Sequence, residues 1–150
     1  MEIFIIRLVM AMMAGLIIGF ANKCQNQADS STPIRVFVMI CLGATLVTIT
    51  STELFIGISP LTSDPGRLSA QVVSALGFLG TGIIWLSEEE RKLKGVSVVA
   101  SLWVTAIIGM LIGAGLNSAT VLGTFFMILV YWFYNLVDNR KRLNNNKVKE

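Results

Sequence analysis

Hydrophobic residues occur in long runs along this chain, and the charged residues fall between the runs. The longest run without a charge lies between Lys94 and Asp138 and has 43 residues. A membrane-spanning helix needs about 20 mostly apolar residues, so this run is long enough for two spans and a turn. Its middle, residues 113–118, contains glycine, asparagine and serine, which are turn residues. We therefore predict a tight hairpin at this point.

The complete pattern predicts five spans, which lie at residues 3–21, 34–58, 65–86, 96–116 and 119–137. The runs do not alternate between polar and apolar residues, as strands of a membrane barrel do. In hydrocarbon every backbone N–H and C=O must be bonded within the protein, which favours helices. The predicted fold class is therefore all-α, a polytopic membrane protein with a bundle of five transmembrane helices. The first run lacks an Ala-x-Ala site at its end, so we interpret it as a retained helix rather than a cleaved signal peptide.

The basic residues are distributed unevenly over this layout. Five spans place successive loops on alternate sides, and ten of the twelve Lys and Arg residues then share the side of the C-terminus. Arg7 and Arg67 lie on the other side. An excess of Lys and Arg marks the cytoplasmic side, so we predict an external N-terminus and a cytoplasmic C-terminus. The transmembrane domain is residues 1–137, and residues 138–150 form a short basic tail that contacts anionic lipid rather than nucleic acid.

The composition excludes several kinds of catalytic and metal-binding site. The chain is 54% hydrophobic and only 14% charged, which is unlike a water-soluble enzyme. It has no histidine, which excludes His-based acid–base catalysis and His-ligated metal. Its two cysteines, Cys24 and Cys41, are too few for a disulfide framework or a four-thiolate zinc site. We therefore expect neither an enzyme nor a cofactor.

Glycines recur at helical spacing within three of the predicted spans. In lipid, helices associate through close packing, and small residues let two backbones approach each other. Helix packing is therefore favoured over the alternative interpretation, in which the glycines thin the walls of a transport path. The packing candidates are Gly15 and Gly19 in the first span, Gly77, Gly80 and Gly82 in the third, and Gly109 and Gly113 in the fourth.

A line of polar residues begins at the start of the third predicted span. Asp64 is a favoured N-cap and Pro65 is favoured at the first helical position, so we predict that the helix starts there with the Asp64 carboxylate on free N–H groups. Arg67, Gln71 and Ser74 follow at spacings that keep to the same helix face. Polar groups at this depth are costly and usually face a bundle interior or a water-filled cavity. We therefore expect this polar stripe to point inward.

Four charged residues are predicted to meet at the outer end of the bundle, namely Arg7, Glu53, Asp64 and Arg67. Arg7 and Glu53 lie near the level at which the third span begins. The sequence leaves open an alternative, in which Asp64 only caps its helix and Arg67 only extends its charge to the membrane surface. Asp64 and Glu53 are also weak candidates for a metal site, because hard cations take oxygen ligands.

Two segments resemble the MgtC/SapB family of membrane proteins. Residues 64–82, DPGRLSAQVVSALGFLGTG, look like the signature segment of that family. Residues 95–109, GVSVVASLWVTAIIG, are similar to its segment GLTTAASLWVTA. Weaker similarities in the first two spans extend the match over about residues 3–136. The sequence differs from the family pattern at residues 20–23, where Phe-Ala-Asn-Lys stands in place of the family's Glu-Arg-Glu. It also differs at Ser97 and Val98, which replace a Thr-Thr pair.

The resemblance implies a bacterial inner-membrane protein with a five-helix domain, associated with growth at low magnesium and survival inside macrophages. It also implies a partner, because the best-known member restrains the proton-driven ATP synthase within the membrane. Many members carry a soluble C-terminal domain after the helices, whereas this sequence has the basic tail there.

The sequence is therefore compatible with two functions of different classes. The first is a regulatory membrane protein that contacts a partner complex through its helices under magnesium limitation or acid stress, with ATP synthase as the partner that the resemblance implies. The alternative is a transporter or channel for Mg²⁺ or another cation, with Asp64 and Glu53 as outer ligands. Both place the chain in the lipid bilayer, and assembly into a homo-oligomer is compatible with either. Cation flux into liposomes separates the two.

Overall fold

The computed structural model describes residues 2–25, 32–58, 64, 66–87, 92–115, 117–118, 120–130 and 132–133. Helices form because each apolar run satisfies its own backbone hydrogen bonds. The helices are α1 (Glu2–Gln25), α2 (Ile34–Ile58), α3 (Arg67–Ile83) and α4 (Val96–Ala114), and a further helix, Thr120–Val130, which we call the fifth helix. Two short strands, β1 (Trp85–Ser87) and β2 (Lys92–Lys94), join α3 to α4.

The predicted fold class is confirmed, and three of the described helices are long and apolar enough to cross a membrane. They span Glu2–Lys23, Ile34–Glu53 and Val96–Ala114. Helix α3 has 17 residues, which corresponds to about 26 Å at the usual rise per residue. The predicted tail, residues 138–150, lies outside the described residues.

The third predicted span is shorter in the structure than in the prediction. It was expected to continue to residue 86, but α3 ends at Ile83 and the chain turns extended at Ile84, with φ −79° and ψ 122°. Trp85 then pairs with Lys94 in an antiparallel hairpin. This change of structure has a local reason, because consecutive β-branched and aromatic residues favour strands.

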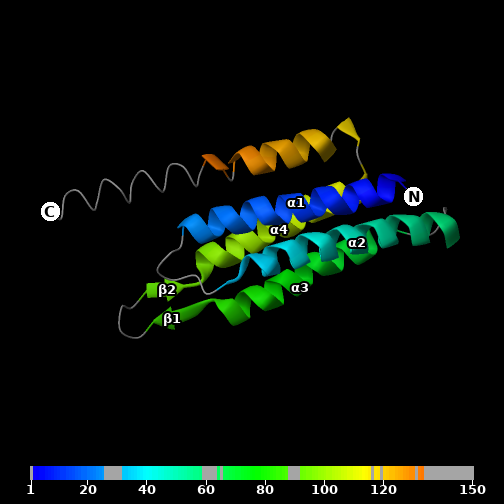
Figure 1. Ribbon diagram of the computed structural model, residues 1–150. Helices are drawn as coiled ribbons and strands as arrows, with labels where there is room; N and C mark the ends of the chain where they lie inside the picture. Colours follow the sequence, from blue (N-terminus) through cyan, green and yellow to red (C-terminus); the bar gives the residue numbers. More distant parts are fainter. Residues whose placement is uncertain are drawn as a thin grey trace.

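Successive helices run in opposite directions along one axis (Figure 1). The two strands lie at one end of the bundle, which we call the hairpin end, together with the end of α1 and the start of α2. The start of α1, the end of α2 and the start of α3 lie at the opposite end. Helices α1, α2 and α4 pack on one another, and α3 packs on α2 and α4. The fifth helix lies on the side of the bundle away from α3 (Figure 1).

Two glycines with positive φ mark the ends of α4. Gly95 precedes the helix with φ 87°, and a Cβ there would collide with the carbonyl oxygen of Ile83. Gly115 follows the helix with φ 124°, a conformation that side chains other than glycine's rarely adopt. The hairpin predicted for residues 113–118 is thus found where the turn residues indicated it.

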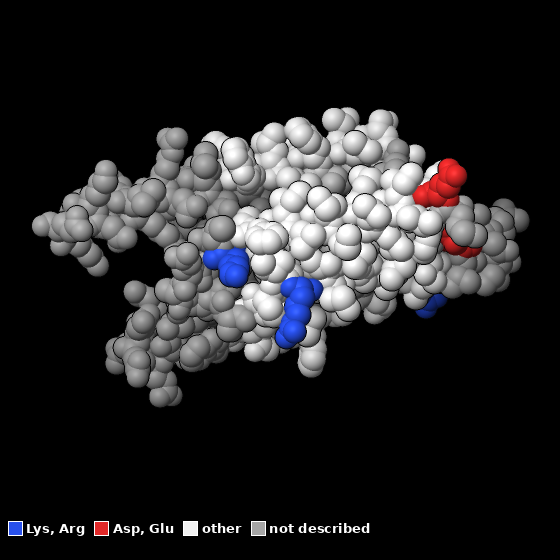
Figure 2. Space-filling model, in the orientation of Figure 1, with Lys and Arg blue, Asp and Glu red and all other residues white. Residues whose placement is uncertain are grey.

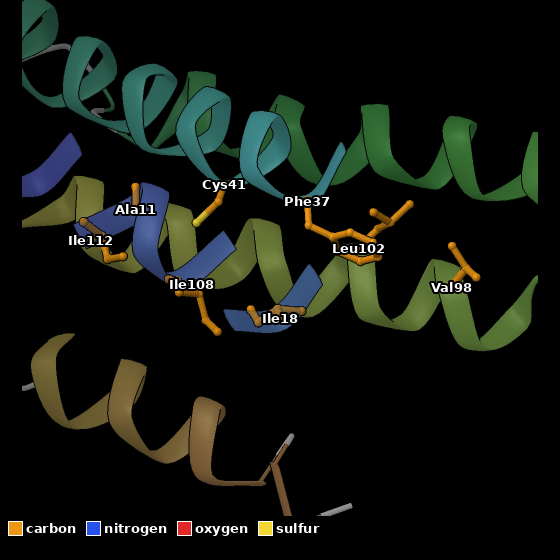
Figure 3. Packing of buried hydrophobic residues seen from close by; sticks show 9 residues of the cluster. Ala11, Ile18, Phe37, Cys41, Val98, Leu102, Ile108 and Ile112 are labelled. Atoms are coloured by element: carbon orange, nitrogen blue, oxygen red, sulfur yellow. The ribbon is translucent and has the colours of Figure 1, made fainter. Parts of the chain in front are cut away.

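The hydrophobic core lies where α1, α2 and α4 meet (Figure 3). Side chains from all three helices are buried against one another there, and Met127 and Ile128 of the fifth helix pack against their edge. The labelled members of this cluster are Ala11, Ile18, Phe37, Cys41, Val98, Leu102, Ile108 and Ile112. Large apolar side chains elsewhere on α1, such as Phe20 and Ile3, are exposed, as expected for a surface that faces lipid.

Candidate functional site: the helix interior and the outer face of α3

Three glycines bring the backbones of α1, α2 and α4 into contact. A Cβ added to Gly15 would lie 2.7 Å from the Cα of Val38. A Cβ added to Gly113 would lie 2.7 Å from the carbonyl oxygen of Thr45, and one on Gly109 would collide with the carbonyl oxygen of Cys41. Both α1 and α4 therefore approach α2 more closely than any other residue type would permit.

The remaining glycines predicted to pack behave in two ways. A Cβ on Gly19 would lie 2.8 Å from Cγ2 of Ile34, and one on Gly80 would lie 2.9 Å from Cγ1 of Val99. Gly77 and Gly82 differ, because a Cβ at either position would meet no described atom within 4 Å. A packing role for Gly77 and Gly82 stays a prediction, because any contact that they make would be with atoms outside the described bundle.

The interface between α2 and α4 contains buried hydroxyl groups that the sequence analysis did not single out. The Thr45 hydroxyl lies 2.8 Å from the carbonyl oxygen of Cys41 in its own helix and 2.9 Å from that of Gly109 in α4. The Thr48 hydroxyl donates to the Ala44 carbonyl at 2.8 Å and accepts a bond of 3.3 Å from Ser69 of α3. These side chains thus join α2 to α4 through a backbone carbonyl and to α3 through a hydroxyl.

A second polar contact joins α1 to α4 nearer the hairpin end. Nδ2 of Asn22 donates to the hydroxyl of Ser101 at 2.8 Å, and both residues are buried. The Ser101 hydroxyl donates in turn to the Ser97 carbonyl at 3.0 Å, and Thr105 donates to the Ser101 carbonyl at 2.7 Å. The four-residue spacing of 97, 101 and 105 is the signal that could have identified this face of α4.

Arg7 lies at the end of α4 in the structure. Its Nη1 lies 3.4 Å from the carbonyl oxygen of Gly113, and a Cβ on Gly115 would lie 3.4 Å from its Nη2. Its Nε is buried and has no hydrogen-bond partner among the described atoms. The last carbonyls of a helix carry partial negative charge and favour a cation. Arg7 therefore caps α4 electrostatically, a contact that the sequence analysis did not anticipate.

The other three members of the predicted charge cluster, Glu53, Asp64 and Arg67, are exposed. Among the described residues, no ion pair is found that links any of them to Arg7 or to one another. The cluster stays a prediction, and so does the weak metal candidacy of Asp64 and Glu53. Within the described part of the chain, no group of three or more Cys, Asp or Glu residues is placed to hold a metal ion.

Asp64 bonds to the turn that precedes α3. Its Oδ1 accepts a hydrogen bond of 2.9 Å from the Gly66 N–H, and its carbonyl accepts one of 3.2 Å from the Arg67 N–H. The prediction of a carboxylate on a free backbone N–H is thus met, but the helix begins later than expected. It starts at Arg67, and Gly66 rather than Asp64 is its N-cap residue; Pro65 lies outside the described residues.

The polar stripe of α3 points away from the bundle, contrary to the expectation that it faces inward. Arg67, Gln71 and Ser74 are all exposed. The face of α3 that meets α2 and α4 carries Leu76 and Gly80, which are buried. The spacing of the stripe was predicted correctly, but the direction of a helix face depends on where its neighbours lie, which spacing does not specify.

A groove of about 370 Å³ opens between α2, the first turn of α3 and the last turns of α4. Residues of α2 and α3 that carry hydroxyl groups line it together with apolar residues of α4, and the surface that it exposes is mainly apolar. The lining residues are Thr48, Thr52, Gly66, Ser69, Ile107, Met110, Leu111 and Ala114. The groove therefore lies at the end of the bundle opposite the hairpin.

Charge is divided along the axis of the bundle (Figure 2). Figure 2 shows acidic side chains, in red, at the end opposite the hairpin, and basic side chains, in blue, toward the hairpin end, with a further basic side chain near the red ones. The chain order agrees with this picture, since Glu2 and Glu53 belong to one end and Lys23 and Arg35 to the other. Among the described residues, the two ends thus differ in charge, and the predicted distribution of all twelve basic residues stays a prediction.

Comparisons with known proteins place the chain in a family. Residues 8–140 match the model of the MgtC family. The chain is 35% identical over 130 residues to "Putative magnesium transporter YhiD" of Escherichia coli (strain K12), a match that covers 85% of this chain and 58% of that protein. It is 35% identical over 120 residues to "Protein MgtC" of Brucella abortus (strain 2308), covering 80% of this chain and 46% of that one.

An uncharacterized protein of Synechocystis sp. (strain ATCC 27184) is also similar, at 34% identity over 129 residues, with 84% of this chain and 49% of that protein covered. The chain spans about half the length of the curated relatives it matches. No solved structure matches it. The MgtC family is not a known enzyme family. The long apolar helices and the match over residues 8–140 together show that this chain is a membrane protein and belongs to the MgtC family.

Proposed function

We propose that this chain is a regulatory protein of the bacterial inner membrane, without enzymatic activity, that acts through helix–helix contacts with a membrane partner. Magnesium limitation or acid stress is the proposed setting. One observation carries the proposal, namely the direct backbone contact of α2 with α1 and α4 at Gly15, Gly109 and Gly113. A bundle closed in this way offers its outer surface, rather than its interior, for function.

The buried hydroxyls support the same conclusion. The Thr45 and Thr105 hydroxyls contact backbone carbonyls within the bundle. A transport path for a hydrated cation requires oxygen ligands that are free to replace water. These hydroxyl groups are hydrogen-bonded to backbone carbonyls, so they contribute to helix packing instead. The interior is therefore organised to keep helices together.

The proposed orientation places the hairpin end in the cytoplasm and the start of α1 outside. Lys23 and Arg35 lie toward the hairpin end, and an excess of basic residues marks the cytoplasmic side. The proton-driven ATP synthase is the partner to test first, because the resemblance to the family implies it.

A second candidate function, cation transport, is favoured by two observations. The name of the Escherichia coli relative describes that protein as a possible magnesium transporter. The groove at the end opposite the hairpin has Thr48, Thr52 and Ser69 among its lining residues, and Asp64 precedes the lining residue Gly66 by two positions.

Liposomes that contain the purified chain together with a proton-pumping ATP synthase test both functions. We expect ATP-driven proton pumping to fall when the chain is present, and Mg²⁺ entry, measured with a trapped fluorescent indicator, to stay at the level of empty liposomes. A Gly109→Leu variant should lose the effect on pumping, whereas Gly43→Leu, at an α2 glycine with no described atom within 4 Å of a Cβ, should retain it. Mg²⁺ entry that disappears in Asp64→Asn would contradict the proposal and establish the transporter.

A further inference from the structure

Helix α3 has a face that no other described helix covers. It comprises residues at spacings of three and four, and we call it the outer face of α3. Its members are Arg67, Gln71, Ser74, Phe78 and Thr81, all of them exposed. Phe78 is 79% exposed, more than any other large hydrophobic side chain in the described part of the chain. The face therefore combines polar groups with one protruding aromatic ring.

The polar members of this face differ in whether they already have a hydrogen-bond partner within the described chain. The Thr81 hydroxyl already donates to the Phe78 carbonyl at 2.7 Å. Gln71 and Ser74 lie about 6 Å and 10 Å along the helix from Arg67, where water becomes scarce. An amide or hydroxyl that faces hydrocarbon without a partner is costly, so these two side chains require hydrogen-bonding groups from outside the described bundle.

We propose that a second copy of this chain covers the outer face of α3, in a parallel dimer whose two-fold axis runs along the membrane normal. Two copies inserted with the same orientation place identical residues at the same depth, and an isologous interface must complement itself. Gln71 meets this condition, because its amide carries both donors and an acceptor and can bond to Gln71 of the partner subunit. Interhelical amide pairs of this kind stabilise helix association in membranes.

The charged end of the face is also self-complementary. Arg67 and Asp64 are both exposed and lie three residues apart at the start of α3. Oδ1 of Asp64 is engaged with the Gly66 N–H, which leaves its second carboxylate oxygen to accept from Arg67 of the partner subunit. The two-fold axis generates this ion pair twice, so that the dimer neutralises two cations and two anions at the membrane surface.

The apolar part of the face provides a projection and a recess. Phe78 protrudes, and Gly82 follows it by four residues, one turn further along the helix. A Cβ at Gly82 would meet no described atom within 4 Å, so the space above this glycine is open. The two copies can therefore approach each other closely at Gly82, in the manner of small-residue contacts between membrane helices.

The fifth helix does not account for the polar face, because it lies on the other side of the bundle in both views (Figures 1 and 3). Its own exposed side chains are apolar, among them Leu122, Phe125 and Phe126. That surface suits lipid without a protein partner. The contrast between the two outward surfaces assigns the interface to α3, and the dimer goes beyond the regulatory role, which rests on the closed interior.

Disulfide trapping in native membranes tests the interface directly. In a background with Cys24→Ser and Cys41→Ala, a Ser74→Cys chain should form a covalent dimer on mild oxidation, since the two-fold axis brings the same position of both copies together. The matched control is Phe126→Cys on the fifth helix, which is also exposed and lies at a similar distance from the start of its helix. Equal trapping at both positions, or none at position 74, would overturn the proposal.

Association measured without cysteines provides the second readout. Fluorescently labelled full-length chains, diluted stepwise in liposomes, should show energy transfer that Gln71→Leu weakens by roughly tenfold in the dissociation constant. Phe126→Ala should leave the transfer unchanged. If the chain stayed monomeric at every protein density in the liposomes, the dimer would be contradicted, and the effect on proton pumping would be unaffected. If a chain that still dimerises had no effect on pumping, only the regulatory role would be contradicted.

Discussion

The α1–α2–α4 interior and the outer face of α3 place polar side chains in opposite situations. In the interior, Thr45 and Thr105 are buried and in hydrogen-bonding contact with backbone carbonyls. On α3, Gln71 and Ser74 are exposed and point away from the described helices. Polar residues within a membrane span therefore serve in two ways. A buried hydroxyl stabilises its own bundle, whereas an amide on the outer surface requires a hydrogen-bonding partner from another molecule.

The largest effect is expected from filling the closest backbone contact of the interior. Gly109→Leu places a side chain against the carbonyl oxygen of Cys41, so α2 and α4 must separate. Overpacking of this kind lowers the free energy of unfolding by about 3 kcal/mol. Thermal unfolding in detergent, followed by circular dichroism, measures the loss. Gly43→Leu is the control, and equal losses in the two variants would contradict the interior contact.

A smaller loss is expected from the polar contact between α1 and α4. Asn22→Leu removes the bond from Nδ2 to the Ser101 hydroxyl, and we expect the unfolding free energy to fall by about 1 kcal/mol, as for other interhelical hydrogen bonds in membranes. Thr50→Val, at an exposed position of α2, should change little. A more stable Asn22→Leu protein would show that this buried amide is not a stabilising contact.

The turn before α3 should show a comparable or slightly smaller effect. Asp64→Ala removes the acceptor of the Gly66 N–H and should cost about 0.5–1 kcal/mol, the usual range for losing a capping side chain. Asp64→Asn retains an acceptor oxygen and should restore most of the stability. If the two substitutions had the same effect, the carboxylate charge rather than this hydrogen bond would be what stabilises the turn.

The smallest effect on the folded monomer is expected at the outer face of α3. Gln71→Leu replaces an exposed side chain, so the unfolding free energy of the detergent-solubilised monomer should change by less than about 0.5 kcal/mol. The same substitution should strongly weaken association in liposomes. A large loss of monomer stability would remove the distinction between the two regions.

Local patterns predicted much of the fold. The bounds predicted for the second span, residues 34–58, are those of α2. The turn at Gly115 follows from its glycine and its neighbours. What the sequence could not specify depends on contacts between distant segments. Asn22 and Ser101 are 79 residues apart, and no local pattern pairs them.

The direction of the α3 stripe is a second example of this limit. The spacing of Arg67, Gln71 and Ser74 establishes that they share one face, but which face meets α2 and α4 depends on the packing of Leu76 and Gly80. The end of α3 at Ile83 was missed for a related reason, since the pairing of Trp85 with Lys94 competes with the helix.

The contact between Arg7 and the Gly113 carbonyl has a consequence for biosynthesis. The two residues are 106 positions apart, so the guanidinium group enters the membrane long before its acceptor emerges from the ribosome. A chain truncated ahead of α4 lacks that acceptor, and its first helix must turn the cation back toward the lipid headgroups. The contact between Arg7 and α4 therefore forms only after α4 has been synthesised.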